Sequence, residues 1–183
     1  MTIALYLALS LLVAGALFLA LRPAIAAFLR FRGKRLVVCP ENQHAASVEV
    51  SKSRAALSTL LGEEKIQLNG CSRWPEKEGC GQECVAQIAS SPEGCLVKSV
   101  VNQWYHGRAC VYCLRRFEDI HWHDHQPALA TEDGELKQWS ELKAEDLPDL
   151  FATARPVCWN CMIAVTFRKE HPELVVDRHR RSA

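Results

Sequence analysis

The chain opens on a long apolar segment and then alternates short apolar and polar runs. No charged residue occurs from Thr2 to Leu21. A helix of about 20 residues, rising about 1.5 Å per residue, matches the hydrocarbon core of a bilayer, which is about 30 Å thick. We therefore expect residues 2–21 to form a transmembrane helix. The rival interpretation is a cleaved secretory signal, since Ala24-Ile25-Ala26 resembles a cleavage triplet, but no Lys or Arg precedes the apolar run.

The polarity pattern after residue 35 predicts a small fold of short strands and helices. In the first part we expect a hairpin, a helix, a returning strand and two further helices, at Leu36–Cys39 with Ala46–Val50, Ser53–Leu61, Lys65–Leu68, Gly81–Ala89 and Leu96–His106. In the last helix Trp104 and Tyr105 fall at core positions. They are expected to pack inside the domain.

The second part of the pattern predicts another hairpin and a final helix. The expected elements are a strand at 116–122, a turn at 132–135, a strand at 136–139, a helix-compatible stretch at 140–150 and a helix at Met162–Lys169 that begins at a cysteine pair and stops before His171-Pro172. The predicted fold class is α+β, with an N-terminal transmembrane helix and a small Cys-rich domain of zinc-ribbon or treble-clef type.

This pattern divides the chain into four parts. We expect an anchor with a basic juxtamembrane segment at 1–35, a Cys-rich α+β subdomain at 36–106, a treble-clef-like zinc-binding subdomain at 107–176 and a basic tail at 177–183. Basic residues cluster just after the apolar run, at Arg22, Arg30, Arg32, Lys34 and Arg35. By the positive-inside rule, the N-terminus lies outside and the domain lies in the cytoplasm, below the inner (cytoplasmic) membrane.

Charge and cysteine content narrow the chemistry. The formal net charge of +1 over 183 residues gives no sign of a nucleic-acid partner. Nine cysteines is a high count for this length, and the odd number would leave one thiol over if all were paired. Because cytosolic thiols stay reduced, these cysteines are better explained as metal ligands than as disulfides.

Two Cys-x-x-Cys pairs are the clearest chemical motif. Cys110-Val-Tyr-Cys113 and Cys158-Trp-Asn-Cys161 each form a tight turn that directs two sulfurs the same way. Two such turns facing each other supply the four thiolates that structural zinc prefers. We therefore expect zinc here. The alternative, two buried or disulfide-bonded pairs, depends on which side of the membrane the domain occupies.

The other five cysteines form a second candidate set. Cys71, Cys80, Cys84 and Cys95 lie within one short stretch, and Cys39 ends a predicted strand. Cys80 and Cys84 are four apart at the start of an expected helix, so they would share a face. The spacing leaves open whether Cys39 or Cys95 completes a four-thiolate site. It also leaves open zinc, an iron–sulfur cluster, buried thiols and disulfide chemistry.

A histidine-rich stretch adds a third candidate. In His121-Trp122-His123-Asp124-His125, alternate histidines would fall on one face of a strand, where they could bind metal or act as a base. The plainer alternatives are exposed side chains on a strand edge, or second-shell hydrogen bonds to the zinc cysteines.

Together with the two cysteine pairs, Asp124-His125-Gln126-Pro127 resembles the zinc-stapled HNH endonucleases over about a third of the chain. The resemblance implies a histidine base at His125 beside a catalytic cation. That family carries an Asn or His where this chain has Met162, so the residue that would hold the cation is missing and we assign no catalytic residue.

The whole chain also resembles a group of membrane-anchored, Cys-rich bacterial proteins. The similar segments are Cys71-Ser-Arg-Trp-Pro-Glu, Gly79-Cys-Gly-Gln-Glu-Cys84 and Arg155-Pro-Val-Cys-Trp-Asn-Cys161. That group implies no activity. It supports a single functional unit from anchor to tail.

The sequence thus favours a membrane-anchored cytoplasmic protein that binds one or two Zn²⁺ ions and is not an enzyme. We expect it to act as an adaptor or accessory subunit, with a protein partner in a membrane complex. Two alternatives remain open: an iron–sulfur or thiol redox protein at the membrane, with the cluster at Cys71–Cys95, and a degenerate HNH-type nuclease.

Overall fold

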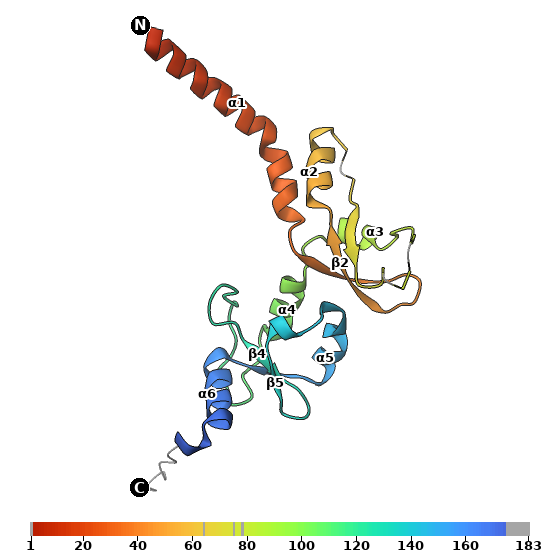
Figure 1. The fold of residues 1–183 in the computed structure, drawn as a ribbon, viewed down its shortest axis with the longest axis vertical. Helices are drawn as coiled ribbons and strands as arrows, with labels where there is room; N and C mark the ends of the chain where they lie inside the picture. Colours follow the sequence, from red (N-terminus) through yellow and green to blue (C-terminus); the bar gives the residue numbers. More distant parts are fainter. Residues whose placement is uncertain (1, 64, 75, 78, 175–183) are drawn as a thin grey trace. The chain divides into compact units, whose positions relative to one another are not determined.

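The chain folds into two compact units joined within one helix. The computed structural model describes residues 2–63, 65–74, 76–77 and 79–174. Unit 1 runs to Ser99 and unit 2 starts at Val100. Both units combine helices with strands, as the predicted α+β class requires (Figure 1). The expected basic tail at 177–183 lies outside the described residues.

Helix α1 (Thr2–Arg30) is one continuous helix that includes Pro23. The predicted span and the juxtamembrane turns after it therefore form a single element. Its apolar part is exposed, and it is long and apolar enough to cross a membrane, with a mean hydropathy of 2.5. Ala24 and Ala27 near its end are buried, and so is Phe31 just beyond it. The end of the helix is thus part of unit 1.

A three-stranded antiparallel sheet forms the centre of unit 1. Its strands are β1 (Lys34–Val38), β2 (Ala45–Val50) and β3 (Leu68–Cys71), in the order β1-β2-β3. The predicted hairpin is confirmed by the pairing of β1 with β2. The expected strand at Lys65–Leu68 was placed too early: it begins at Leu68 and includes Cys71, because pairing with β2 runs from Val50 back to Val48.

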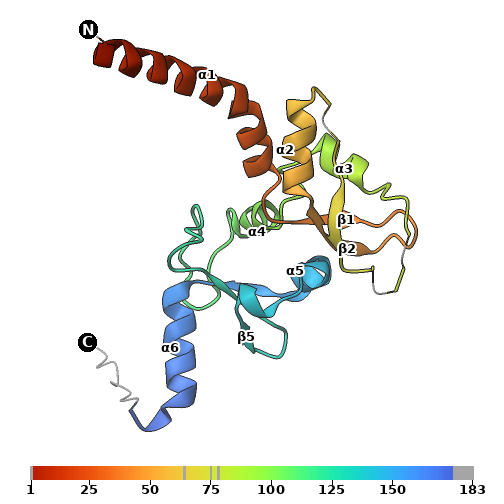
Figure 2. The same cartoon turned by 45° about the horizontal axis from the view of Figure 1, so that its top comes forward.

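Helix α2 (Lys52–Leu60) runs beside the end of α1 in the opposite direction, as Figures 1 and 2 both show. The Lys52 ammonium lies 5.7 Å from the Phe28 ring centroid. Ala55 and Phe31 both belong to the apolar core of unit 1. This core also includes valines from both strands of the β1–β2 hairpin. The sheet, α2 and the end of α1 therefore pack around one centre.

Helix α3 (Val85–Ser90) starts later than its predicted range of Gly81–Ala89. Cys84 is its N-cap residue and Cys80 precedes it. The expectation that Cys80 and Cys84 share a helix face is therefore wrong. Helix α4 (Val97–Tyr105) confirms the predicted amphipathic helix and carries the chain from unit 1 into unit 2.

Unit 2 contains a second antiparallel sheet, in the order β5-β4-β6. The strands are β4 (Ala128–Ala130), β5 (Leu136–Lys137) and β6 (Arg155–Val157), and the helices are α5 (Leu147–Thr153) and α6 (Trp159–Glu170), with 3₁₀ turns at Trp139–Glu141, Ala144–Asp146 and Pro172–Leu174. The predicted turn at 132–135 joins β4 to β5.

The predicted strand at 116–122 is wrong. Arg116 makes an isolated bridge with Ala109, and the backbone then passes into bends and turns. The central strand is β4 instead, which pairs with β5 on one side and β6 on the other. Its three residues are all buried. A continuous buried run gives no alternating pattern, so the polar alternation upstream was mistaken for the strand.

Aromatic side chains fill the interior of unit 2, and the core role predicted for Trp104 and Tyr105 is confirmed. Tyr105 is fully buried, its hydroxyl donates to the Ala128 carbonyl oxygen at 2.5 Å, and burial raises its pKa. Trp104 stacks on Phe151 with ring centroids 4.9 Å apart. The end of α4 is thereby fixed to β4 and α5.

Candidate metal centre

The first cysteine pair lies on a tight turn closed by backbone hydrogen bonds. The Cys110 amide donates to the Arg115 carbonyl at 2.9 Å, and the Leu114 amide donates to the Cys110 carbonyl at 2.9 Å. Leu114 has a φ of +59°, in the left-handed region that β-carbon sterics disfavour. The turn therefore holds a strained residue directly after Cys113.

The second pair lies where β6 runs into α6. Cys158 is the N-cap residue of α6, and Cys161 belongs to its first turn. The Met162 amide donates to the Cys158 carbonyl at 2.9 Å, which is the first hydrogen bond of the helix. The predicted helix at the second pair is therefore confirmed. The Val111 amide donates to the Pro156 carbonyl at 3.0 Å and ties the two turns together.

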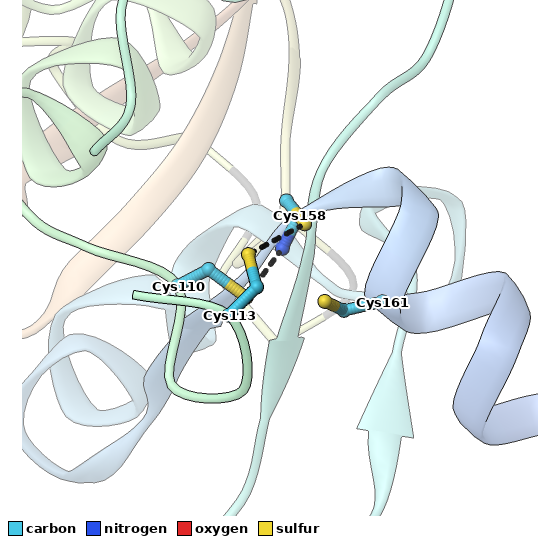
Figure 3. A group of neighbouring side chains, drawn as sticks. All are labelled: Cys110, Cys113, Cys158 and Cys161. Atoms are coloured by element: carbon cyan, nitrogen blue, oxygen red, sulfur yellow. Dashed lines mark hydrogen bonds between the residues drawn. The ribbon is translucent and has the colours of Figure 1, made fainter. Parts of the chain in front are cut away.

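These two turns bring four sulfur atoms into one group. The sulfurs of Cys110, Cys113, Cys158 and Cys161 all lie within 4.8 Å of one another, and Figure 3 shows them between the first turn and the start of α6. The sulfurs of Cys113 and Cys158 are 3.7 Å apart. A tetrahedron with Zn–S bonds of about 2.3 Å has edges of about 3.8 Å, whereas a disulfide needs about 2.05 Å. The geometry fits a metal ion.

The protonation of the group also favours a cation. Burial alone would raise the pKa of Cys110, but backbone N–H groups from Cys158, Cys113 and Tyr112 lower it to about 7. Burial, and then the neighbouring sulfurs, raise the pKa of Cys161, and burial likewise raises that of Cys158. Burial and the neighbouring sulfurs thus oppose full deprotonation of the group, and a positive ion between the sulfurs would favour it.

The group is enclosed on one side and accessible on the other. Cys110 is fully buried, whereas Cys113 is exposed. A small apolar cluster lies around the buried side, with Val157 and Met162 as its largest buried side chains. Four protein sulfurs complete a tetrahedral set, so they leave no open position at which an ion could activate water. Such a site is suited to a structural role.

The other five cysteines lie in unit 1, where four of them gather and the fifth lies apart. Cys39, Cys71, Cys80 and Cys84 line one cavity, while the Cys95 thiol donates to the Gln87 carbonyl at 3.6 Å. All nine cysteines carry free thiols. Among the described residues, the group in unit 2 is the one set of ligand atoms that the structure brings within 4.8 Å of one another.

The histidine stretch does not form the expected strand face. His121 and His125 line a cavity of about 560 Å³ beside Trp159, and both are exposed. The Nδ1 atom of His125 lies 2.8 Å from a carboxylate oxygen of Asp124, with both side chains more than half exposed. His123 is exposed as well. His121 and His125 thus line the same cavity as Cys158, and none of the three histidines belongs to the cysteine group.

One polar partner of the cysteines was not predicted from the sequence. The Arg73 guanidinium donates to the Cys39 sulfur at 2.9 Å, across 34 positions of the chain. Arg73 is two residues beyond Cys71, and a basic residue that close to a cysteine cluster was the available signal. No family model, curated protein or solved structure matches the chain. The assignment of the site therefore stands on its geometry.

Proposed function

We propose that this protein is a membrane-anchored zinc-binding protein whose centre at Cys110, Cys113, Cys158 and Cys161 holds unit 2 together. The observation that carries the proposal is the convergence of four sulfurs from two distant turns. Unit 2 contains a cysteine turn, then a hairpin, then a helix that begins at the second cysteine pair. This order of elements supports a treble-clef type of zinc site. An all-sulfur tetrahedral set favours zinc among common divalent ions.

The proposed role is that of an adaptor or accessory subunit in a membrane complex, without catalysis at this centre. Its support is chemical: four thiolates saturate the ion, so neither a water nor a substrate can coordinate it. Such a centre contributes folding free energy and shapes a surface for a protein partner. Resemblance to HNH endonucleases adds no activity, because Met162 replaces the cation ligand.

Helix α1 is proposed to remain as the anchor. Cleavage at the Ala24-Ile25-Ala26 triplet would remove Ala24, which is buried in unit 1. The basic residues just after the apolar run favour a cytoplasmic domain and an external N-terminus. In that compartment the thiols stay reduced and available to metal.

The test is elemental analysis of the full chain, purified in detergent under anaerobic conditions, together with its absorption spectrum and a thiol count. Zinc bound to reduced cysteines is expected, and its removal by a chelator should unfold unit 2. Recovery of a folded, metal-free protein with its sulfurs joined in disulfides would overturn the proposal. Orientation is tested separately with reporter enzymes fused to the C-terminus, active on one side of the membrane or the other.

A further inference from the structure

Unit 1 contains a cavity of about 460 Å³ into which four cysteines gather. They come from four separate segments: Cys39 follows β1, Cys71 ends β3, Cys80 lies in the loop after it, and Cys84 caps α3. Cysteines are about 5% of this chain, so four of the 16 lining residues is a marked concentration.

The sheet register explains how Cys39 and Cys71 reach the same place. Strand β2 lies between β1 and β3, and Cys71 pairs with Val48 of β2. The Cys39 amide donates to the His44 carbonyl at 2.9 Å, just before β2 begins. Both residues therefore lie at the same end of the sheet. Cys84 is buried in the core of the unit, and Cys39 and Cys71 pack against that core.

Cys95 lies in a different environment. Its backbone carbonyl accepts from the Leu36 amide at 2.7 Å, and its thiol donates to the Gln87 carbonyl. Among the described residues that line the cavity, Cys95 does not occur. Cys95 packs against the same core as Cys39 and Cys71, but the cavity lining favours Cys39 over Cys95, a choice that spacing could not make.

A positively charged side chain lies beside these thiols. Arg73 donates to the Cys39 sulfur at 2.9 Å and to a Glu41 carboxylate oxygen at 3.3 Å. Lys77 also lines the cavity. Four thiolates around a divalent ion carry a net charge of about −2, and a guanidinium donor next to one sulfur reduces the cost of that charge.

We propose that Cys39, Cys71, Cys80 and Cys84 hold a second metal centre, that Arg73 positions its Cys39 ligand, and that Cys95 is not a ligand. This extends the proposed metal-binding function but rests on a separate set of ligands. Two metal groups bind to thiolates in this way. One is a single Zn²⁺ ion, which would draw the four sulfurs closer together. The other is an iron–sulfur cluster, in which the thiolates can bind different iron atoms and stay further apart.

The test uses the full chain in detergent, prepared anaerobically, with zinc, iron and acid-labile sulfide measured per chain. Cys158→Ser removes the first centre, so any metal that remains reports on unit 1. In that background we expect Cys95→Ser to keep the metal and Cys39→Ser to lose it. Zinc alone would identify a single Zn²⁺ ion, whereas iron with sulfide and visible colour would identify an iron–sulfur cluster. Either result supports the assignment of the four cysteines as ligands.

Two results would overturn the assignment: a Cys158→Ser protein with no metal, or metal lost with Cys95→Ser and kept with Cys39→Ser. Neither bears on the first centre, which Cys39→Ser alone should leave loaded. A measurement without mutation covers the case in which Cys39→Ser fails to fold. Alkylation of Cys80 in the native protein should accelerate when a chelator strips the metal, and an unchanged rate would refute the proposal.

Discussion

Replacing Cys158 with serine is expected to unfold unit 2 and to leave unit 1 folded. Serine removes one of the four sulfurs, and α6 loses no capping bond, because the Cys158 side chain makes none and serine is a preferred N-cap residue. Any loss of stability is therefore caused by the metal centre and not by the helix end. The sulfur of Cys158 is 3.7 Å from that of Cys113, so a chain without it has an incomplete tetrahedron.

The magnitude follows from what else surrounds the centre. Burial of Val157 and Met162, the largest buried side chains of the neighbouring cluster, contributes about 1.5–3 kcal/mol each. A structural zinc ion contributes about 10–16 kcal/mol in apparent binding free energy. Since a whole domain is stable by only about 5–15 kcal/mol, losing most of the zinc term exceeds what the apolar contacts can replace.

The assay is hydrogen exchange read by mass spectrometry on the full chain in detergent, which reports on each unit separately. Amides of α6 and β4 should lose protection in Cys158→Ser, while those of β2 should keep it. His123→Ala is the control, because His123 belongs to the same unit, is exposed and is not one of the four sulfur ligands. If Cys158→Ser and His123→Ala retained equal protection in α6, the structural role of the centre would be refuted.

Three further predictions follow. Zn²⁺ binding to the metal-free protein at neutral pH should release at least two protons, from Cys158 and Cys161, whose raised pKa values keep them protonated; calorimetry in buffers of different ionisation enthalpy counts them. Below about pH 7 Cys110 also binds a proton, so the affinity for Zn²⁺ should fall more steeply as the pH is lowered further. A Zn²⁺ affinity that does not change with pH would contradict this. Leu114→Gly should stabilise unit 2 by about 1 kcal/mol in denaturant unfolding, because Leu114 is exposed and has φ +59°; a loss of stability would show that no strain is stored there. Deleting residues 2–22 should release the protein from the membrane fraction and leave unit 1 folded. Phe31→Ala should instead destabilise unit 1 by about 3–5 kcal/mol. If circular dichroism showed that the deletion destabilises unit 1 more than Phe31→Ala does, Phe31 would be excluded from the core.

The sequence predicted the elements whose signals are local. A Cys-x-x-Cys turn needs only a few residues to direct two sulfurs together, so both turns of the metal centre were visible before the fold was known. Helix α4 has periodic apolar positions, and α6 has a clear stop at His171-Pro172. These signals located four of the candidate ligands.

Features that depend on tertiary pairing were not predictable. The central strand of unit 2 is Ala128-Leu129-Ala130, three buried residues without alternation, while the alternating histidines upstream form bends. The gathering of Cys39 with Cys71 depends on β2 lying between their strands, which spacing along the chain does not encode. Likewise, Arg73 reaches Cys39 across 34 positions.

The uninterrupted course of α1 has a consequence for how partners meet this protein. The helix has 29 residues and is about 44 Å long, and a bilayer core would take up about 30 Å of that length. About 14 Å of stiff helix is left, and its last turns are embedded in unit 1. If α1 crosses the bilayer as proposed, this short length of helix would hold unit 1 close to the lipid headgroups, and a partner would have to approach it there.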